Sequence, residues 1–314
     1  MANFWSHRSM LILLLVSVHS VSCQAARAAV AVEHQITIDG LERTYLVFVP
    51  SKMDRPLPVV LAFHGGGGNA RQMERFSRFD ELAEREGFVV IYPEAIDGNW
   101  NDGRGVEFMR AQRENINDVK FVRLLLDDLG KTIEIDRRRI FATGISNGGF
   151  ISHRLAAEAS DLICGIAPVV GGMAPTVFEK FDPPQPVSIL LIQSDADPLV
   201  PIGGGDVGVE GGRKRGKVVA TTETLATYVK RNGNTGEPMI TTLDNDPKDG
   251  TTVEIAKYRD GLGGVKTTYY LVKNGGHNWP GRGRIGREQT TGKACQEFNA
   301  TQVIWDFFKS CPSR

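Results

Sequence analysis

The chain has 314 residues, with 37 lysines and arginines against 37 aspartates and glutamates, and 41% of its residues are hydrophobic. The resulting net charge of zero gives no electrostatic reason to expect nucleic acid or an anionic membrane as a partner. The hydrophobic content is enough for a sizeable core and excludes global disorder.

Residues 1–28 have the pattern of a signal peptide. Arg8 gives a positive start, residues 10–18 form a short apolar stretch, and Ala26-Arg27-Ala28 fits a cleavage site. The apolar stretch is too short to span a bilayer, which needs about 20 residues. We therefore expect secretion, either extracellular or periplasmic, with no stable membrane insertion after cleavage. An uncleaved N-terminal anchor is the alternative, and Cys23 leaves lipid attachment open.

The rest of the chain alternates between predicted strands and predicted helices. Asp39-Gly40 lies between two short alternating stretches, at 35–38 and 44–49, and predicts a β-hairpin. Further strands are predicted at 58–63, 88–92, 139–143, 166–170, 187–192, 252–258 and 267–272, and helices at 71–85, 117–133, 150–158, 222–231 and 299–309. This order predicts an α/β fold with a mostly parallel central sheet, helices on both faces and an N-terminal antiparallel hairpin. Because no repeat, linker or composition break interrupts residues 29–314, we expect them to form a single domain.

Four cysteines are too few for a disulfide framework. Cys295 and Cys311 flank the last predicted helix, whose length of about 16 Å would keep them apart. Cys164 lies in an apolar stretch and is expected to be a small buried side chain. No cluster of cysteine and histidine suggests a metal site, so none is expected.

The motif Gly144-Ile145-Ser146-Asn147-Gly148 has the form G-x-S-x-G between a predicted strand and a predicted helix. A serine at such a turn has a strained backbone and an exposed Oγ, as the nucleophile of a serine hydrolase requires. The amide of Asn147, the next residue, would be one donor of an oxyanion hole.

A serine nucleophile needs a base, and His277 is the best candidate among the six histidines. His277 follows the last predicted strand, whereas His34 precedes the first and His153 lies about two turns along the helix after Ser146. His64 ends a strand but precedes Ser146, which conflicts with the order serine, acid, histidine. His7 and His19 fall within the predicted signal peptide.

The acid is expected after a strand between Ser146 and His277, and the stretch 192–198 offers Asp195 and Asp197. Either aspartate could instead cap a turn. A second oxyanion donor is expected from the glycine run His64-Gly65-Gly66-Gly67, which follows a buried strand. A phosphate-binding loop is the rival interpretation of this run, but no G-K-[ST] follows it.

Five ordered motifs give the chain a family resemblance, which covers nearly all of residues 29–314. They are His64-Gly65-Gly66-Gly67-Gly68-Asn69, Trp100-Asn101-Asp102-Gly103-Arg104, Gly144-Ile145-Ser146-Asn147-Gly148-Gly149, Ala196-Asp197-Pro198-Leu199-Val200-Pro201 and Gly275-Gly276-His277-Asn278-Trp279-Pro280-Gly281. The chain resembles the polyhydroxybutyrate depolymerase-like esterases, which include feruloyl and acetylxylan esterases of carbohydrate esterase family one.

The resemblance implies an α/β-hydrolase fold and a cofactor-free esterase. Carried over, it assigns the nucleophile to Ser146, the acid to Asp197, the base to His277 and an oxyanion donor to Gly66. Two departures stand out. Gln193-Ser194-Asp195 replaces the usual His-Gly-Thr, which adds a second aspartate, and many members have a cysteine at the position of Gly66.

Two tryptophans and one basic loop are candidates for substrate binding. Trp100 and Trp279 lie in loops expected near the site, where they would stack on a sugar or aromatic ring or else pack against the end of the sheet. Arg213-Lys214-Arg215 lies in the glycine-rich stretch 203–216 and would be a solvated loop or a site for an acidic glycan group.

The sequence therefore predicts an exported serine esterase that acts through an acyl-enzyme. Its expected substrates are feruloyl or acetyl esters of polysaccharide, or related soluble esters. The alternatives are a depolymerase of polyhydroxybutyrate or its oligomers, and a peptidase or non-catalytic binding module on the same fold.

Overall fold

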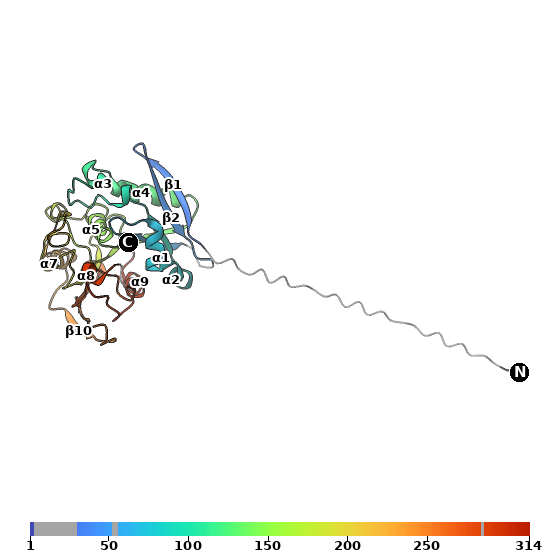
Figure 1. Cartoon of the computed structure of the whole chain (residues 1–314). Helices are drawn as coiled ribbons and strands as arrows, with labels where there is room; N and C mark the ends of the chain where they lie inside the picture. The colour runs from blue at the N-terminus through green and yellow to red at the C-terminus, as the bar shows by residue number, and fades with distance from the viewer. Residues whose placement is uncertain (3–29, 52–55, 284–285) are drawn as a thin grey trace.

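The predicted N-terminal hairpin forms one edge of a large mixed sheet (Figure 1). β1 (Val32–Ile38) pairs antiparallel with β2 (Leu41–Phe48), and the turn residues Asp39 and Gly40 have φ angles of 52° and 78°. Positive φ at both positions is what a two-residue hairpin turn needs. The computed structural model describes residues 1–2, 30–51, 56–283 and 286–314. The expected cleavage site and Cys23 lie outside the described residues.

Within the described residues, ten strands lie in the order β1, β2, β4, β3, β5, β6, β7, β12, β11, β10. The central strands from β4 to β12 are parallel, while the outer strands at both edges pair antiparallel. Their bounds are β3 (Leu57–Phe63), β4 (Val89–Pro93), β5 (Ile135–Ile145), β6 (Gly165–Val169), β7 (Ser188–Ser194), β10 (Met239–Leu243), β11 (Thr252–Lys257) and β12 (Thr267–Lys273). This arrangement confirms the predicted α/β class and its parallel centre.

Helices cover both faces of the sheet because its central strands are apolar on both sides. Along β3, Val60 and Ala62 belong to one core cluster, whereas Val59, Leu61 and Phe63 belong to the other. The first cluster is closed by α1 (Ala70–Ser77), α2 (Phe79–Glu86) and α9 (Ala300–Ser310), and the second by α4 (Asp118–Leu129), α5 (Asn147–Glu158) and α7 (Thr221–Asn232). The short helices are α3 (Arg110–Arg113), α6 (Pro175–Phe178) and α8 (Glu288–Thr291).

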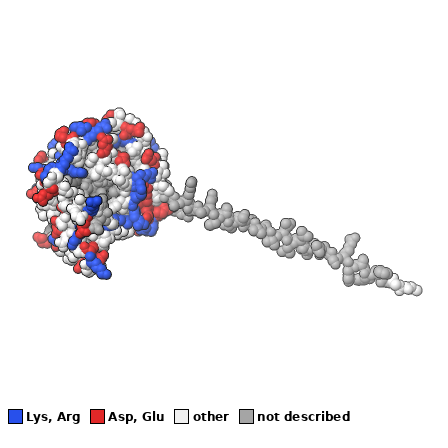
Figure 2. All heavy atoms as spheres, in the orientation of Figure 1, with Lys and Arg blue, Asp and Glu red and all other residues white. Residues whose placement is uncertain are grey.

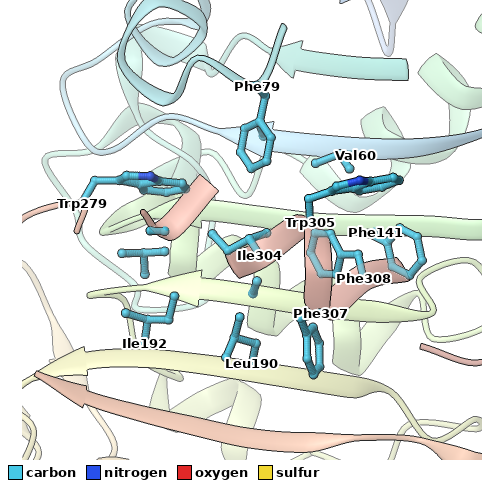
Figure 3. Close-up of a cluster of buried hydrophobic side chains, with 14 of the residues drawn as sticks. Val60, Phe79, Phe141, Leu190, Ile192, Trp279, Ile304, Trp305, Phe307 and Phe308 are labelled. Carbon is cyan, nitrogen blue, oxygen red and sulfur yellow. The ribbon is translucent and has the colours of Figure 1, made fainter. Parts of the chain in front are cut away.

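The C-terminal helix α9 contributes Trp305, Phe307 and Phe308 to the first cluster (Figure 3). Trp305 stacks on Phe88 with ring centroids 3.8 Å apart, and Phe308 stacks on Phe141 at 4.6 Å. Stacked and edge-on aromatic pairs add about 0.5–1.5 kcal/mol each beyond the area they bury. The aromatic side of this helix therefore packs directly on the sheet and on Phe88 beside it.

Two features differ from the predicted elements. The single helix expected over 71–85 is two helices, α1 and α2, separated at Arg78, which has a φ of 55°. Left-handed backbone is uncommon in a residue other than glycine, and nothing in the local pattern announces it. The exposed edge strand β10 was not predicted, nor was the small pair β8 (Gly205–Asp206) and β9 (Lys217–Val218).

Cys164, Cys295 and Cys311 are buried free thiols. Burial raises the pKa of all three, to about 12 for Cys311. Cys164 is the small buried side chain that the sequence predicts.

Over the described part of the chain, no helix combines the length and the hydrophobicity that a bilayer crossing requires.

Candidate active site

Ser146 occupies a sharp turn between β5 and α5. Its φ and ψ angles are 56° and −121°, a combination that non-glycine residues rarely adopt. The turn is pressed against the backbone of β3, since a β-carbon placed on Gly148 would lie 2.2 Å from the carbonyl oxygen of Phe63, and one on Gly144 would lie 2.6 Å from the same atom. Glycine is therefore required on both sides of the serine.

His277 and Asp197 form a hydrogen-bonded pair beyond the carboxyl ends of β12 and β7. The His277 Nδ1 lies 2.7 Å from the Asp197 Oδ2, and the two side chains are 7% and 1% exposed. The other carboxylate oxygen of Asp197 accepts hydrogen bonds from the amides of Leu199 and Val200. Both oxygens are thus engaged, which holds the carboxylate toward the imidazole ring.

Asp195 points elsewhere, although the sequence left it as a candidate acid. Its Oδ1 accepts a hydrogen bond of 2.6 Å from the amide of Asn274, and its Oδ2 lies 3.9 Å from the Lys273 ammonium. The Asp195 side chain is 30% exposed. This aspartate ties the loop after β7 to the end of β12, while Asp197 is the one that contacts His277.

The other described histidines have structural surroundings. His153 is fully buried on α5 with its Nδ1 3.1 Å from the Tyr228 hydroxyl, and burial lowers its pKa to about 3. His34 lies within β1, not before it as predicted, and stacks on Tyr45. The Nε2 of His64 accepts a hydrogen bond from the amide of Ala95, and burial lowers its pKa to about 4. These rings are occupied in packing or in fixing the backbone.

The glycine loop after β3 lies directly beside the serine turn. A β-carbon on Gly66 would lie 3.6 Å from the Cβ of Asn147, so the two backbones are neighbours. The amides of Gly67 and Gly68 donate to carbonyl oxygens of nearby turns, and the Gly66 amide takes part in neither bond. Asn147 is the first residue of α5, where an amide has no acceptor within the helix. The backbones of Gly66 and Asn147 therefore lie side by side, next to Ser146.

A buried polar network fixes the side chain of Asn147. Its Oδ1 accepts a hydrogen bond of 2.8 Å from the amide of Trp100, and its Nδ2 donates to the carboxylate of Asp102. Asp102 in turn forms a buried ion pair with Arg104 at 2.7 Å. Sequence reasoning did not assign these roles, although the segment Trp100–Arg104 was singled out as a motif. Hydrogen bonds of this kind lock the residue that follows Ser146.

The structure corrects the assignment of Trp100 and Trp279 as substrate platforms. Both side chains are completely buried, so neither has a free face for a sugar or aromatic ring. Trp100 donates its indole N–H to the carbonyl of His64, and Trp279 donates to the Thr301 hydroxyl within the first core cluster. A buried indole usually needs a hydrogen-bond partner for its N–H. Because each ring here bonds to another segment of the chain, each helps to fix the position of its loop.

Two cavities open at Ser146. The larger, of about 760 Å³, is lined by the glycine loop, side chains of α1, Ser146 and His277. The smaller, of about 260 Å³, lies on the side of Asn147 and the loop 207–215. Ser146 and Gly66 line both cavities. A substrate that spans them would place its central atoms over the serine.

Among the described residues, no group of three or more metal-ligating side chains is present.

Sequence comparisons relate the chain to esterases. It is 27% identical over 287 residues to a protein named as an esterase, NocK of Nocardia uniformis subsp. tsuyamanensis, with 89% of this chain and 83% of that protein covered. It is 27% identical to feruloyl esterase B of Piromyces equi over 78% of this chain, and 31% identical to poly(3-hydroxyalkanoate) depolymerase C of Paucimonas lemoignei over 40% of it. The chain covers only 44% and 30% of the length of these two relatives. No family model matches.

The solved structure of an acetyl xylan esterase from Aspergillus awamori superimposes with a TM-score of 0.61 at 14% identity, over 89% of this chain and all of that one. Identity at this level supports the fold alone. Together with the strand order and the sequence relatives, it shows that the chain has the α/β-hydrolase fold and is a homologue of carboxylic ester hydrolases that include feruloyl esterases, acetylxylan esterases and a poly(3-hydroxyalkanoate) depolymerase.

Proposed function

We propose that this protein is an exported serine esterase that hydrolyses feruloyl or acetyl esters of polysaccharide, or related soluble esters, through an acyl-enzyme. The observation that carries the proposal is the hydrogen-bonded pair of Asp197 and His277, which shares one cavity with the serine turn. The three groups lie past strands β5, β7 and β12, at the sheet edge where α/β proteins bind ligands.

In the proposed reaction, the Ser146 Oγ attacks the ester carbonyl carbon and its proton moves to the Nε2 of His277. Asp197 holds the Nδ1–H and stabilises the imidazolium. The amides of Gly66 and Asn147 donate to the oxyanion, and each such donor is worth about 10²–10³ in rate. When the intermediate collapses, the leaving alkoxide takes the proton from His277. Water then attacks the acyl-enzyme, returns a proton through His277 and releases the carboxylic acid.

The size of the site supports small or single-chain esters as substrates. The larger cavity of about 760 Å³ lies within the range of about 300–1,000 Å³ that is usual for small-molecule sites. A chain segment could lie in this cavity with its ester group at Ser146. Polyhydroxyalkanoate oligomers remain a second substrate class because the relatives include a poly(3-hydroxyalkanoate) depolymerase.

The test compares wild-type protein with Ser146→Ala on p-nitrophenyl acetate, methyl ferulate and hydroxybutyrate oligomers. Loss of the nucleophile is expected to lower kcat by at least about 10⁴-fold, since removing a catalytic serine elsewhere costs about 10⁶. Ser310→Ala, at an exposed serine in the last turn of α9, is the matched control and is expected to keep wild-type rates. Equal activity in wild type and Ser146→Ala would refute the assignment.

Covalent labelling separates an enzyme from a binding module on the same fold. A fluorophosphonate is expected to add one adduct to wild-type protein and none to Ser146→Ala, as seen by intact mass. Absence of an adduct on wild type would favour the binding module. Rates on the three esters rank the substrate classes, and cleavage of a peptide without cleavage of any ester would favour the peptidase.

A further inference from the structure

The two cavities at Ser146 share one charged side chain, that of Arg215. It lines both the larger cavity and the smaller one, together with Gly66, Ser146 and Leu199. A hydrolysed ester has an acyl part and an alcohol part, which must lie on opposite sides of the attacked carbon. Arg215 therefore lies where a group on either part of the substrate would pass.

The charges that line these cavities have one sign. In addition to Arg215, Arg75 of α1 lines the larger cavity and Arg104 and Arg213 line the smaller, while the described lining residues include no aspartate or glutamate. The chain as a whole carries equal numbers of basic and acidic residues, and the face in Figure 2 shows both interspersed. The positive lining is therefore a local property of the site.

Arg215 has a fixed backbone and a guanidinium that faces the reacting centre. Its amide donates to the carbonyl of Val207 at 2.8 Å, and its own carbonyl accepts from Arg104 at 2.9 Å. A β-carbon placed on Gly66 would lie 3.8 Å from the Arg215 Nη1, which puts the guanidinium close to the expected oxyanion donor.

The neighbouring arginines differ from Arg215 in having partners. Arg104 is paired with the buried carboxylate of Asp102, and Arg213 lies 3.5 Å over the ring of Phe108. Among the described residues, no carboxylate forms an ion pair or hydrogen bond with the Arg215 guanidinium. Its planar set of N–H donors matches a carboxylate in two parallel hydrogen bonds.

We propose that Arg215 selects esters that carry a second, free carboxylate, on either the acyl or the alcohol part, and binds that carboxylate next to Ser146. The proposal rests on the serine esterase function proposed above and narrows its substrate class to anionic esters. A carboxylate on the acyl part would be that of a dicarboxylic half-ester. A carboxylate on the alcohol part would be that of a hydroxy acid or a sugar acid.

Two matched pairs of esters test the proposal and separate the two sides. p-Nitrophenyl succinate and p-nitrophenyl butyrate differ by a carboxylate on the acyl part. 3-Acetoxybutyrate and 3-acetoxybutyramide both release acetate and differ by a carboxylate on the alcohol part. For each pair the quantity measured is the ratio of kcat/KM for the anionic ester to that for the neutral ester.

Arg215→Gln is expected to lower this ratio about tenfold or more for at least one pair, since hydrogen bonds to charged groups are stronger than those between neutral groups. Arg215→Lys is expected to recover part of the ratio, because the charge remains while the two-pronged geometry is lost. Lys217→Gln removes a nearby exposed charge that lies outside the basic loop 213–215 and lines neither cavity, and it is the matched control, with a ratio expected within twofold of wild type.

Unchanged ratios in Arg215→Gln for both pairs would overturn the proposal. An equal loss of kcat on the anionic and neutral members would also overturn it, because Arg215 would then act on the oxyanion of every ester. A binding measurement keeps this test separate from the proposed function. In Ser146→Ala protein, monomethyl succinate should give saturation-transfer NMR signals that disappear with Arg215→Gln and persist with Lys217→Gln. Signals unaffected by Arg215→Gln would refute the carboxylate site even if no ester were hydrolysed.

Discussion

The two aspartates after β7, which are separated only by Ala196, show how residues of one type take different tasks. Asp197 has one oxygen on His277 and the other on two backbone amides, whereas Asp195 is partly exposed and holds the Asn274 amide. The sequence correctly predicted that both aspartates follow the strand β7, but it did not indicate which way either side chain points. The conformation of the loop after β7, where the Asp197 Oδ1 accepts from the amides of Leu199 and Val200, determines which carboxylate contacts the histidine.

Amide replacements at these two positions are expected to have very different effects. Asp197→Asn is expected to lower kcat by about 10⁴-fold, the effect seen when the acid of a serine protease is replaced by its amide. Asp195→Asn removes only a partly exposed charge and is expected to change kcat by less than about threefold, consistent with surface substitutions worth under 0.5 kcal/mol. Steady-state kinetics on p-nitrophenyl acetate measure both, and an inactive Asp195→Asn beside an active Asp197→Asn would reverse the assignment.

The junction of β5 and α5 is the element on which the candidate site depends. Gly148→Ala would bring a β-carbon to 2.2 Å from the Phe63 carbonyl oxygen, an atom of the sheet backbone that cannot move aside. We expect this variant to lose about 3 kcal/mol or more of unfolding free energy, at the upper end of overpacking effects. Urea denaturation measures the loss.

Gly203→Ala is the matched control for this prediction. Gly203 is exposed and a β-carbon there would meet no atom within 4 Å, so the stability is expected to stay within about 0.5 kcal/mol of wild type. Equal midpoints for Gly148→Ala and Gly203→Ala would mean that the turn can relax away from β3.

At the level of elements, sequence patterns predicted most of the sheet but not its edge or its breaks. The buried strands are continuous apolar runs, and helices such as α4 begin at a capping residue, Asn117, whose side chain accepts from the Lys120 amide. β10 has no buried residue and no continuous apolar run, and its pairing with β11 is a tertiary contact. The left-handed Arg78 likewise depends on how α1 and α2 pack on the sheet.

For the candidate site, sequence order and strand ends predicted that Ser146, Asp197 and His277 lie together. In the structure Asp197 is hydrogen-bonded to His277, and His277 lines one cavity with Ser146. The sequence left open whether Trp100 and Trp279 bind substrate or pack against the sheet, because an aromatic residue in a loop has the same sequence signal whether it faces solvent or the core. Their complete burial agrees with packing. Burial of Trp100 follows from its packing against Phe63 and His64, which only the assembled loop creates.

Across the whole molecule, buried titratable groups change the stability of the fold with pH in two opposite directions. Asp80 makes the fold less stable as pH rises, whereas His64 and His153 make it less stable as pH falls. Burial raises the pKa of Asp80 to about 7, so between about pH 4 and 7 the folded state keeps a proton that the unfolded state releases, and stability falls as pH rises. Burial lowers the pKa of His64 and His153 to about 4 and 3, so the unfolded state binds protons first and stability falls as pH drops below about 6.5.

Asp80→Asn removes the group that lowers the stability of the fold as pH rises. Its Oδ1 accepts a hydrogen bond of 2.6 Å from the Tyr92 hydroxyl, and an asparagine oxygen can still accept it. The stability of Asp80→Asn relative to wild type is therefore expected to increase from pH 4 to pH 7, by at most about 4 kcal/mol at 1.36 kcal/mol per pKa unit. Urea denaturation at pH 4.5, 6 and 7.5 measures the change, with Asp244→Asn at an exposed edge position as control. A difference from wild type that stays constant over this range would contradict the prediction.

The docking of α9 also sets the order in which this protein can complete its fold. Its Trp305 and Phe308 stack on Phe88 and Phe141, which emerge from the ribosome much earlier. Contacts between such distant segments form slowly, because a large loop must close, at a cost in chain entropy, before buried apolar surface stabilises the contact. Until residues 300–310 have been synthesised, the sheet face beneath α9 stays uncovered, and a chaperone would have its longest opportunity to bind there.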